Sequence, residues 1–334
     1  MGTFWEGTMK LPRRRFLRLA AGAAALPFVS GFAGAQAYPA RTVKFILPFG
    51  PASGIDITAR LFADRLAARW GKPVVVENRP GGEGLIAIGA FVSANDHHTL
   101  LFSPVGTFAV HPYGQEKLPY SAERDLQPIA SVSSILLAVS ISESLKVGSL
   151  AELVALARAQ PGKLNAAAAN GTSDFLLFGF LKGAGLQVAR VPYRDIMQAP
   201  NDLAEDRIQL LMTSFAVVQP HLQAGKVKVL AVTSRQRAPS APAIPTVAEA
   251  GYPELQMDSP VGLFGPRGMR LELRARIADE LKAVVAADPV IRPRIESTGQ
   301  LVAVVGPAEF AAVIEEMRRK LAATATILGV KSTQ

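Results

Sequence analysis

Short apolar runs alternate with amphipathic helical stretches along most of the chain. Residues 43–48 and 74–77 are apolar runs of strand length, and residues 99–103 make a third. Between the first two, residues 56–70 place apolar side chains on one side and charged side chains elsewhere, as in an amphipathic helix. A further apolar segment ends near Asn95. This alternation predicts a doubly wound unit of an α/β fold with parallel sheets.

A second unit is predicted after Ile129. Ser149 and Glu152 have the spacing of a capping box, which predicts a helix that runs towards Gln160. Strands are predicted at 208–212 and 227–233. Pro307 is expected to open a terminal helix. The apolar stripe of that helix is formed by Phe310, Val313, Ile314, Met317 and Leu321.

The N-terminus has the three-part layout of an export signal. Basic residues between Lys10 and Arg18 precede an apolar run at 19–32, and small residues end the segment at 33–37. The apolar run is shorter than the roughly 20 residues that a membrane span needs. We therefore expect residues 1–37 to be a signal peptide that is cleaved near Ala37, and the mature chain to lie in the periplasm. Residues 13–18 resemble the twin-arginine pattern, but twin-arginine or general export and a start at Met1 or Met9 stay open.

Removal of this signal changes the charge of the chain. The 334 residues include 36 basic and 27 acidic ones, a net charge of +9. Residues 1–37 hold five of the basic and one of the acidic residues, which leaves the mature chain at +5. The remaining charges are scattered without a basic stripe, so nucleic-acid binding is not expected. Cysteine is absent, which excludes disulfides, thiolate metal sites and cysteine nucleophiles.

Two glycine-bearing loops follow predicted strands. In open α/β sheets, ligands bind beyond the carboxyl ends of strands, where helix N-termini offer unpaired N–H groups. The candidate ligand-binding residues in these loops are Phe49, Ala52, Ser53, Gly54 and Asp56, followed by Gly81, Gly82, Glu83 and Gly84. The alternative is that both loops are tight turns and that Asp56 only caps a helix.

No catalytic set emerges from the sequence. Residues 82–87 formally match a dinucleotide-binding fingerprint, but no acidic residue closes the strand that ends at Ser103. The histidines are His97, His98, His111 and His221, and there is no glycine-x-serine-x-glycine elbow. Asp96, His97 and His98 are expected to form a solvated loop, because no further ligands cluster there. We therefore expect a protein that is not an enzyme and needs no cofactor or metal.

Several ordered motifs resemble one known family. The most specific stretch is residues 230–234 followed by Pro245 to Gly251, with the sequence PTVAEAG, and Val74 to Gly81, with the sequence VVVENRPG, is close to a family hallmark. Further motifs lie at 38–39, 48–56, 59–60, 118–120, 125–129 and 192–194. Together they span nearly all of the mature chain and resemble the tripartite tricarboxylate transporter receptors, the Bug or TctC-like extracytoplasmic binding proteins.

The resemblance implies an α/β, two-domain, type II periplasmic binding-protein fold with a ligand cleft between the domains. The first domain would comprise residues 38–138 and 262–334 and the second residues 139–261, with crossovers near 136–139 and 260–264. The ligand would be a small carboxylate: a di- or tricarboxylate, an amino acid or an aromatic acid. Backbone groups, small polar side chains and bridging waters would hold it. The receptor, expected to be a monomer, would deliver this ligand to integral membrane transporter subunits.

The resemblance also extends the set of candidate site residues. One ligand carboxylate is expected between Ser53-Gly54 and the loop from Gly81 to Gly84, at the positive end of the helix that carries Asp56. The further candidates are Ser103, Thr107, Asn170, Thr172, Ser173, Tyr193, Thr213 and Ser214. Two alternatives stay open: a sensor that presents the ligand to a membrane-bound kinase, and an α/β enzyme that uses the glycine loops as an anion cradle.

Four departures from the family pattern surround the expected cleft. Ala52 and Ser53 replace two glycines, and Phe175 stands where the family has a histidine. Thr213 replaces an aspartate, and Pro260 replaces a tryptophan. These changes predict a ligand that differs from malate or citrate and is less polar.

Overall fold

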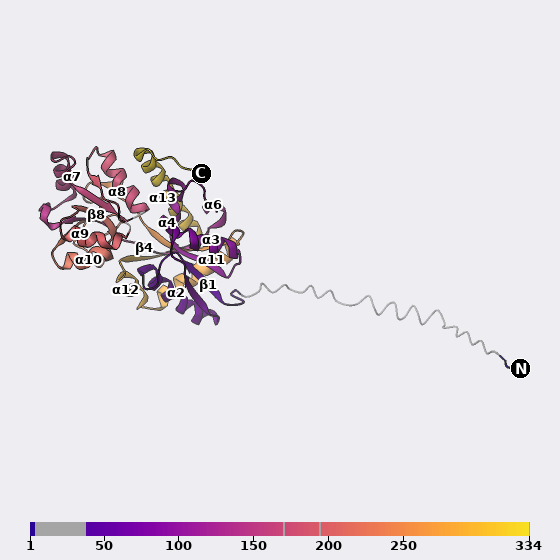
Figure 1. The fold of residues 1–334 in the computed structure, drawn as a ribbon. Helices are drawn as coiled ribbons and strands as arrows, with labels where there is room; N and C mark the ends of the chain where they lie inside the picture. The colour runs from indigo at the N-terminus through magenta and orange to yellow at the C-terminus, as the bar shows by residue number, and fades with distance from the viewer. Residues whose placement is uncertain (4–37, 170, 194, 334) are drawn as a thin grey trace. The chain divides into compact units, whose positions relative to one another are not determined.

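Two mixed β-sheets organise residues 41–334 (Figure 1). The computed structural model describes residues 1–3, 38–169, 171–193 and 195–333. The predicted signal peptide therefore lies almost entirely outside the described residues, and Asn170 lies outside them as well. No helix in the described part of the chain is both long enough and apolar enough to cross a membrane.

The first sheet has six strands in the order β11-β4-β10-β3-β1-β2. Their bounds, in that order, are Gln300–Val305, Gln127–Ile135, Pro260–Gly265, Thr99–Pro104, Val43–Leu47 and Val74–Asn78. Strand β1 pairs in parallel with both β2 and β3. Helices α2 (Gly54–Trp70) and α3 (Leu85–Ala94) connect these three strands, so the predicted doubly wound unit is confirmed.

The second sheet has five strands in the order β7-β6-β8-β5-β9. Their bounds, in that order, are Ala189–Arg190, Asn165–Ala168, Leu210–Ser214, Leu137–Ser142 and Val227–Val232. The strands predicted at 208–212 and 227–233 correspond to β8 and β9. Helix α7 (Leu150–Ala159) begins where the capping-box spacing predicts, since Ser149 Oγ accepts a hydrogen bond from Glu152 N at 3.2 Å.

The remaining helices connect and cover the two sheets. They are α4 (Val105–Ala109), α5 (His111–Gly114), α6 (Ala122–Asp125), α8 (Thr172–Gly183), α9 (Ala199–Ala204), α10 (Phe215–Gln223), α11 (Leu271–Ala287), α12 (Ile291–Glu296) and α13 (Pro307–Leu328). Short 3₁₀ turns lie at η1 (Gly82–Gly84), η2 (Glu143–Leu145), η3 (Ile196–Gln198) and η4 (Pro253–Leu255).

The prediction of parallel sheets was wrong in part. Strand β10 runs antiparallel to both β3 and β4, and β11 runs antiparallel to β4. In the second sheet, β5 runs antiparallel to β8 and β9. A crossover within one sheet makes neighbouring strands parallel, but β5 and β10 are entered from the other sheet. Their direction is therefore free of that constraint.

The chain passes between the two sheets twice. It leaves the first sheet after Ile135 and enters the second at Leu137. It leaves the second sheet after Val232 and re-enters the first at Pro260. The predicted domain segments begin at residues 139 and 262, two residues after the first strand of each new sheet begins. These domain bounds stay a prediction.

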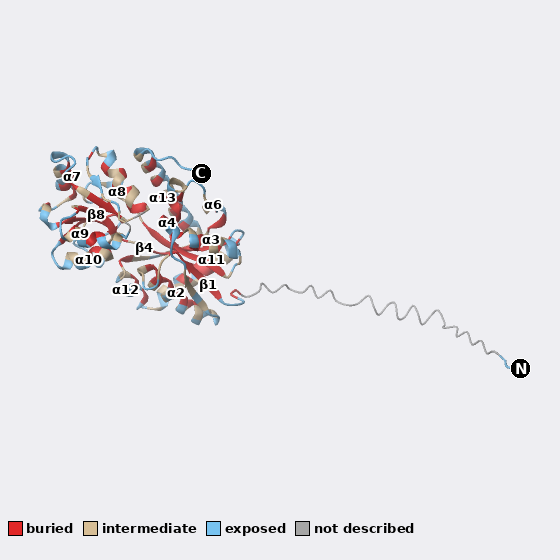
Figure 2. Ribbon diagram, viewed as in Figure 1, coloured by how far each residue is buried: buried red, intermediate tan, exposed pale blue. Residues whose placement is uncertain are grey.

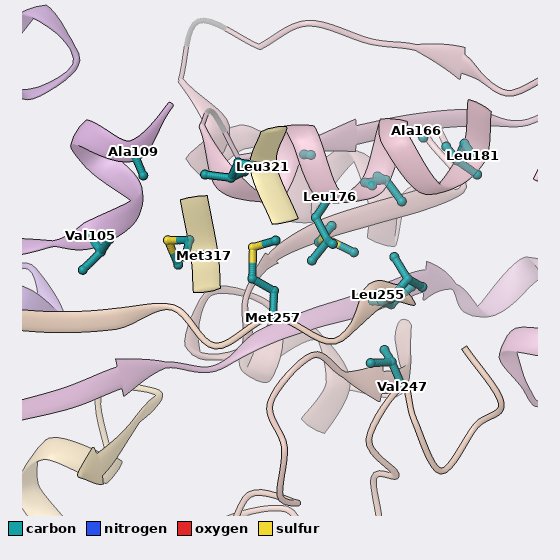
Figure 3. Packing of buried hydrophobic residues seen from close by; sticks show 14 of the residues in the cluster. Val105, Ala109, Ala166, Leu176, Leu181, Val247, Leu255, Met257, Met317 and Leu321 are labelled. Atoms are coloured by element: carbon teal, nitrogen blue, oxygen red, sulfur yellow. The ribbon is translucent and has the colours of Figure 1, made fainter. Parts of the chain in front are cut away.

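Buried apolar residues form a cluster that includes residues from both sheets and from α8 and α13. In Figure 2 the buried residues follow the strands, including β4 and β8. Met317 and Leu321 of α13 belong to the same cluster as Leu176 of α8 (Figure 3). The apolar stripe predicted for the terminal helix is confirmed, because Phe310, Ile314, Met317 and Leu321 are buried and Val313 is half-buried.

Candidate functional site

A cavity of about 410 Å³ lies where ends of strands from both sheets converge. Its volume falls within the range of small-molecule sites. Its walls include the residues after β1, the η1 turn, the junctions of β3 with α4 and of β8 with α10, and the start of α8. Ile135, the last residue of β4, and Leu137, the first residue of β5, also line the cavity; the chain passes from the first sheet to the second between them. The cavity thus has the position predicted for a cleft between two domains.

Three helices of eight or more residues begin at this cavity. They are α3, α8 and α10, and their N-cap residues Gly84, Gly171 and Ser214 all line it. None of these three helix starts has a side chain that hydrogen-bonds to its free N–H groups. Helix N-termini carry unpaired donors and partial positive charge, so each favours an anion. The cavity therefore offers an anion several backbone donors; no lysine or arginine is among its lining residues, and the charged residue there is Glu83.

Thr172 provides a second and independent sign of a ligand. This residue is only 6% exposed, it lines the cavity, and its Oγ1 has no hydrogen-bond partner among the described residues. A buried hydroxyl without a partner is unfavourable unless a ligand or water completes it. A Cβ added at Gly106 of α4 would lie 2.3 Å from Thr172 Oγ1. The close approach of α4 to this hydroxyl therefore requires a glycine.

The loop from Gly81 to Gly84 has four consecutive residues in the left-handed region. Their φ angles are 113°, 55°, 53° and 96°. The third residue is Glu83, for which this conformation costs on the order of 1 kcal/mol because it has a side chain. At Gly84 a Cβ would lie 2.4 Å from Thr107 Cγ2. The glycines predicted from the sequence thus serve a close approach of this loop to α4, and Gly81, Glu83 and Gly84 line the cavity.

Ser53 and Asp56 lie outside the cavity lining and hold the first loop in shape. Ser53 Oγ accepts a hydrogen bond from Asp56 N at 3.2 Å and caps α2. The Asp56 carboxylate is buried and accepts from Ala52 N, Arg60 Nε and Asn78 Nδ2 at 2.8–3.0 Å. Burial opposes the charge of Asp56, but these hydrogen bonds outweigh it and keep the pKa of its carboxyl below the usual 3.8.

We expect Asp56→Asn to destabilise the protein by about 2 kcal/mol near pH 7, because hydrogen bonds to a charged group are lost. A carboxyl whose pKa is lowered by folding stabilises fully above its ordinary pKa and loses that contribution as the pH falls through the lowered value. The gap between wild type and variant should therefore narrow as the pH is lowered below about 4. Urea unfolding at several pH values measures it, and a gap independent of pH would contradict this role.

Ser53→Ala is expected to lower the free energy of unfolding by about 1 kcal/mol, because the cap of α2 is lost. Ligand affinity should stay within about twofold of wild type, since Ser53 does not line the cavity. Urea unfolding and calorimetry on the same sample separate the two effects. A tenfold loss of affinity with normal stability would restore Ser53 as a direct ligand contact.

The structure brings together about half of the residues predicted for the site. On the cavity lining lie Phe49, Gly81, Glu83, Gly84, Thr107, Thr172, Ser173, Thr213 and Ser214. Outside it lie Ala52, Ser53, Gly54, Asp56, Gly82, Ser103 and Tyr193, while Asn170 lies outside the described residues. Ser103 Oγ donates to Pro104 O at 3.0 Å, and Tyr193 OH donates to Asp202 at 2.7 Å, so both hydroxyls have partners in the protein.

Sequence reasoning missed the other half of the lining. These residues are Pro48, Pro104, Gly106, Val110, Ile135, Leu137, Ala169, Gly171 and Ser259. Pro104 and Gly106 directly follow the strand predicted at 99–103, as the two glycine-bearing loops follow theirs, and this position is a signal that could have found them. Ile135 and Leu137 look like ordinary core residues in the sequence, and nothing local marks Ser259.

Comparisons with known proteins agree with this fold. Residues 58–322 match the family model described as tripartite tricarboxylate transporter family receptor. Protein BugT of Bordetella pertussis is 34% identical over 240 residues, which cover 70% of this chain and 73% of that protein.

Two solved structures with bound ligands share the fold. Rpa4515 of R. palustris with adipate has a TM-score of 0.73 at 26% identity and covers 88% of this chain and 99% of its own. MatC (Rpa3494) of Rhodopseudomonas palustris with bound malate has a TM-score of 0.70 at 26% identity, covering 86% and 99%.

Two sheets with a cavity lined from both define the two-domain fold of periplasmic binding proteins, and the structural neighbours share this fold. Within that class, the chain belongs to the tripartite tricarboxylate transporter receptor family. The family is one of solute-binding receptors.

Proposed function

We propose that the mature protein binds a small carboxylate in this cavity and delivers it to the membrane subunits of a tripartite tricarboxylate-type transporter. The observation that carries the proposal is the buried Thr172 hydroxyl, which has no partner among the described residues and lies beside the N-cap of α8. A carboxylate there would accept hydrogen bonds from this hydroxyl and from the free N–H groups of the helix. Both kinds of donor become stronger when the acceptor is charged.

The ligand carboxylate is proposed to sit among the three helix starts. Ser173 and Ser214 are small hydroxyl residues at the beginning of α8 and at the N-cap of α10, and Thr213 precedes the latter. Ser173 and Thr213 are buried and all three line the cavity, which supports the proposal that they contact the ligand or its bridging waters. The loop from Gly81 to Gly84 would complete the site from the first sheet.

The rest of the cavity wall suits an apolar ligand body. Phe49 follows β1, and Pro104, Val110, Ile135 and Leu137 add further apolar surface. Burial of a hydrocarbon segment against such a wall contributes about 0.8 kcal/mol for each CH₂. Adipate, the ligand of the neighbour Rpa4515, has such a hydrocarbon segment, whereas malate, the ligand of MatC, is more polar. We therefore propose a carboxylate with an apolar body.

The proposal also includes the export, the oligomeric state and the domain bounds of the protein. Residues 1–37 are proposed to direct export and to be removed near Ala37, so that the receptor acts in the periplasm as a monomer. The domains are proposed to be residues 38–138 with 262–334, and residues 139–261. N-terminal sequencing of protein from a periplasmic extract should begin near Tyr38. An intact Met9 would contradict this processing.

Ligand recovery tests the binding function. The protein is purified gently from the periplasm, and small molecules released on denaturation are identified by mass spectrometry. We expect a carboxylate that also raises the melting temperature of ligand-free protein when it is added back. Long incubation with that compound should return it unchanged. A chemically altered product would support the enzyme alternative, and failure of every recovered or added carboxylate to stabilise the protein would contradict the proposal.

A further inference from the structure

His111 is a buried histidine that joins the glycine loop to Tyr120. It opens α5 and is 1% exposed. Its Nδ1 lies 2.7 Å from the hydroxyl of Tyr120, and its Nε2 lies 3.0 Å from the backbone oxygen of Glu83. Tyr120 is itself 4% exposed. Both ring nitrogens therefore have partners within the protein.

The partners decide which nitrogen carries the proton. A backbone carbonyl can only accept, so Nε2 must be the protonated nitrogen that donates to Glu83 O. Nδ1 of a neutral imidazole then accepts from the Tyr120 hydroxyl. Burial lowers the pKa of the His111 imidazole, which favours this neutral form. The ring is thus held in one tautomer and one orientation.

The hydrogen bond from His111 is one of two that hold a single peptide group at both of its ends. This peptide joins Glu83, at a φ of 53°, to Gly84. Its C=O accepts from His111, and its N–H, on Gly84, donates to Gly81 O at 3.0 Å. Gly84 is also the N-cap of α3 and lies on the cavity lining. The orientation of this peptide therefore decides where the loop and the first free N–H groups of α3 point.

We propose that His111 is a positioning residue for ligand binding, which clamps the Glu83–Gly84 peptide so that the loop and the start of α3 face the cavity. The effect on affinity rests on the proposed function of that cavity, whereas the effect on the loop does not. His111 itself does not line the cavity and acts only through the loop. Without the clamp, Glu83 loses the backbone hydrogen bond that offsets the cost of its left-handed conformation, and the loop has other conformations open to it.

Four variants separate positioning from simple packing. His111→Leu keeps an apolar side chain in place and removes both hydrogen bonds. His111→Gln retains a nitrogen donor at nearly the distance of Nε2 from the backbone. Tyr120→Phe removes only the hydroxyl that holds Nδ1. His221→Leu is the control, because His221 lies in the last turn of α10 and does not line the cavity.

Hydrogen exchange on ligand-free protein measures the loop directly. In His111→Leu the amides of residues 83–86 should exchange about tenfold faster than in wild type, as expected for the loss of a buried hydrogen bond. They should stay within about twofold in His111→Gln and His221→Leu. If His111→Leu does not fold, ¹⁵N NMR of the His111 ring in wild type and in Tyr120→Phe tests the proposal instead. We expect a protonated, slowly exchanging Nε2 in wild type and faster exchange of that proton in Tyr120→Phe. A wild-type ring protonated on Nδ1 would overturn the proposal.

Binding of adipate and malate, the ligands of the two structural neighbours, tests the consequence. For whichever probe binds wild type, His111→Leu should lose about tenfold in affinity and His111→Gln should retain most of it. Equal loss in both variants with unchanged loop exchange would overturn the positioning role. If neither probe nor the recovered ligand binds wild type while the loop responds as expected, the proposed cavity function fails and the clamp stands.

Discussion

Thr172→Val is expected to weaken binding of the recovered carboxylate by roughly tenfold to a hundredfold, without loss of stability. Valine has nearly the shape of threonine but no hydroxyl, so the change removes one donor to a charged ligand, worth about 1.5–3 kcal/mol. In the ligand-free protein the same hydroxyl is buried and has no partner among the described residues. Its removal should therefore leave the free energy of unfolding unchanged or slightly higher.

Thr326→Val is the matched control for this prediction. Thr326 lies near the end of α13, and its Oγ1 donates to Ala322 O at 3.1 Å on an exposed face of the helix. Affinity in this control should equal that of wild type. Calorimetry gives the affinity and urea unfolding gives the stability of each variant. Wild-type affinity in Thr172→Val would place the carboxylate elsewhere, and a loss of stability would show that the hydroxyl has a structural partner.

Phe310→Ala should cause the largest loss of stability, about 3–5 kcal/mol, as expected when a fully buried phenylalanine is truncated. Phe310 is 0% exposed, and its ring lies 5.2 Å from that of Phe264 in β10. A Cβ on Gly262 would lie 2.3 Å from Phe310 Cζ, so the ring packs directly onto the backbone of that strand. This contact holds the C-terminal helix to the sheet whose strands shape the cavity.

Val313→Ala is the control for Phe310, because Val313 lies on the same helix but is only half-buried. It should cost about 1 kcal/mol or less. Urea unfolding of both variants, with the denaturant slopes compared, measures the difference. A loss below about 1 kcal/mol in Phe310→Ala would mean that the neighbouring rings close the space, contrary to the tight packing against Gly262.

The pattern of apolar and polar residues was sufficient to predict the helix and strands at the start of the mature chain. The predicted helix at 56–70 is α2, which begins at Gly54, and the strands at 43–48 and 74–77 are β1 and β2. The apolar period that predicts these elements depends on residues a few positions apart, and so the sequence alone shows it. The structure adds the serine cap at Ser53 and Gly71 in the left-handed region at the C-terminus of α2.

Position after a strand was also sufficient to find part of the cavity. The sequence predicts Phe49 and the loop from Gly81 to Gly84 as site residues, because ligands bind beyond the carboxyl ends of parallel strands. The pattern did not distinguish residues within a loop. Phe49 lines the cavity, whereas Ser53, a few residues further along, caps α2 instead. A serine before a helix fits both roles, and only the position of the helix relative to the second sheet separates them.

The sequence by itself determined that the chain is an α/β protein of this receptor family, with glycine loops at strand ends and a buried stripe on its last helix. The tertiary structure alone decided the direction of β10 and the close approach of Gly106 to Thr172. It also decided the burial of His111 between Tyr120 and the Glu83 carbonyl. Each of these depends on residues far apart in the chain. Contacts of that kind arise only when the two sheets and their connections are in place, since no local period or spacing encodes them.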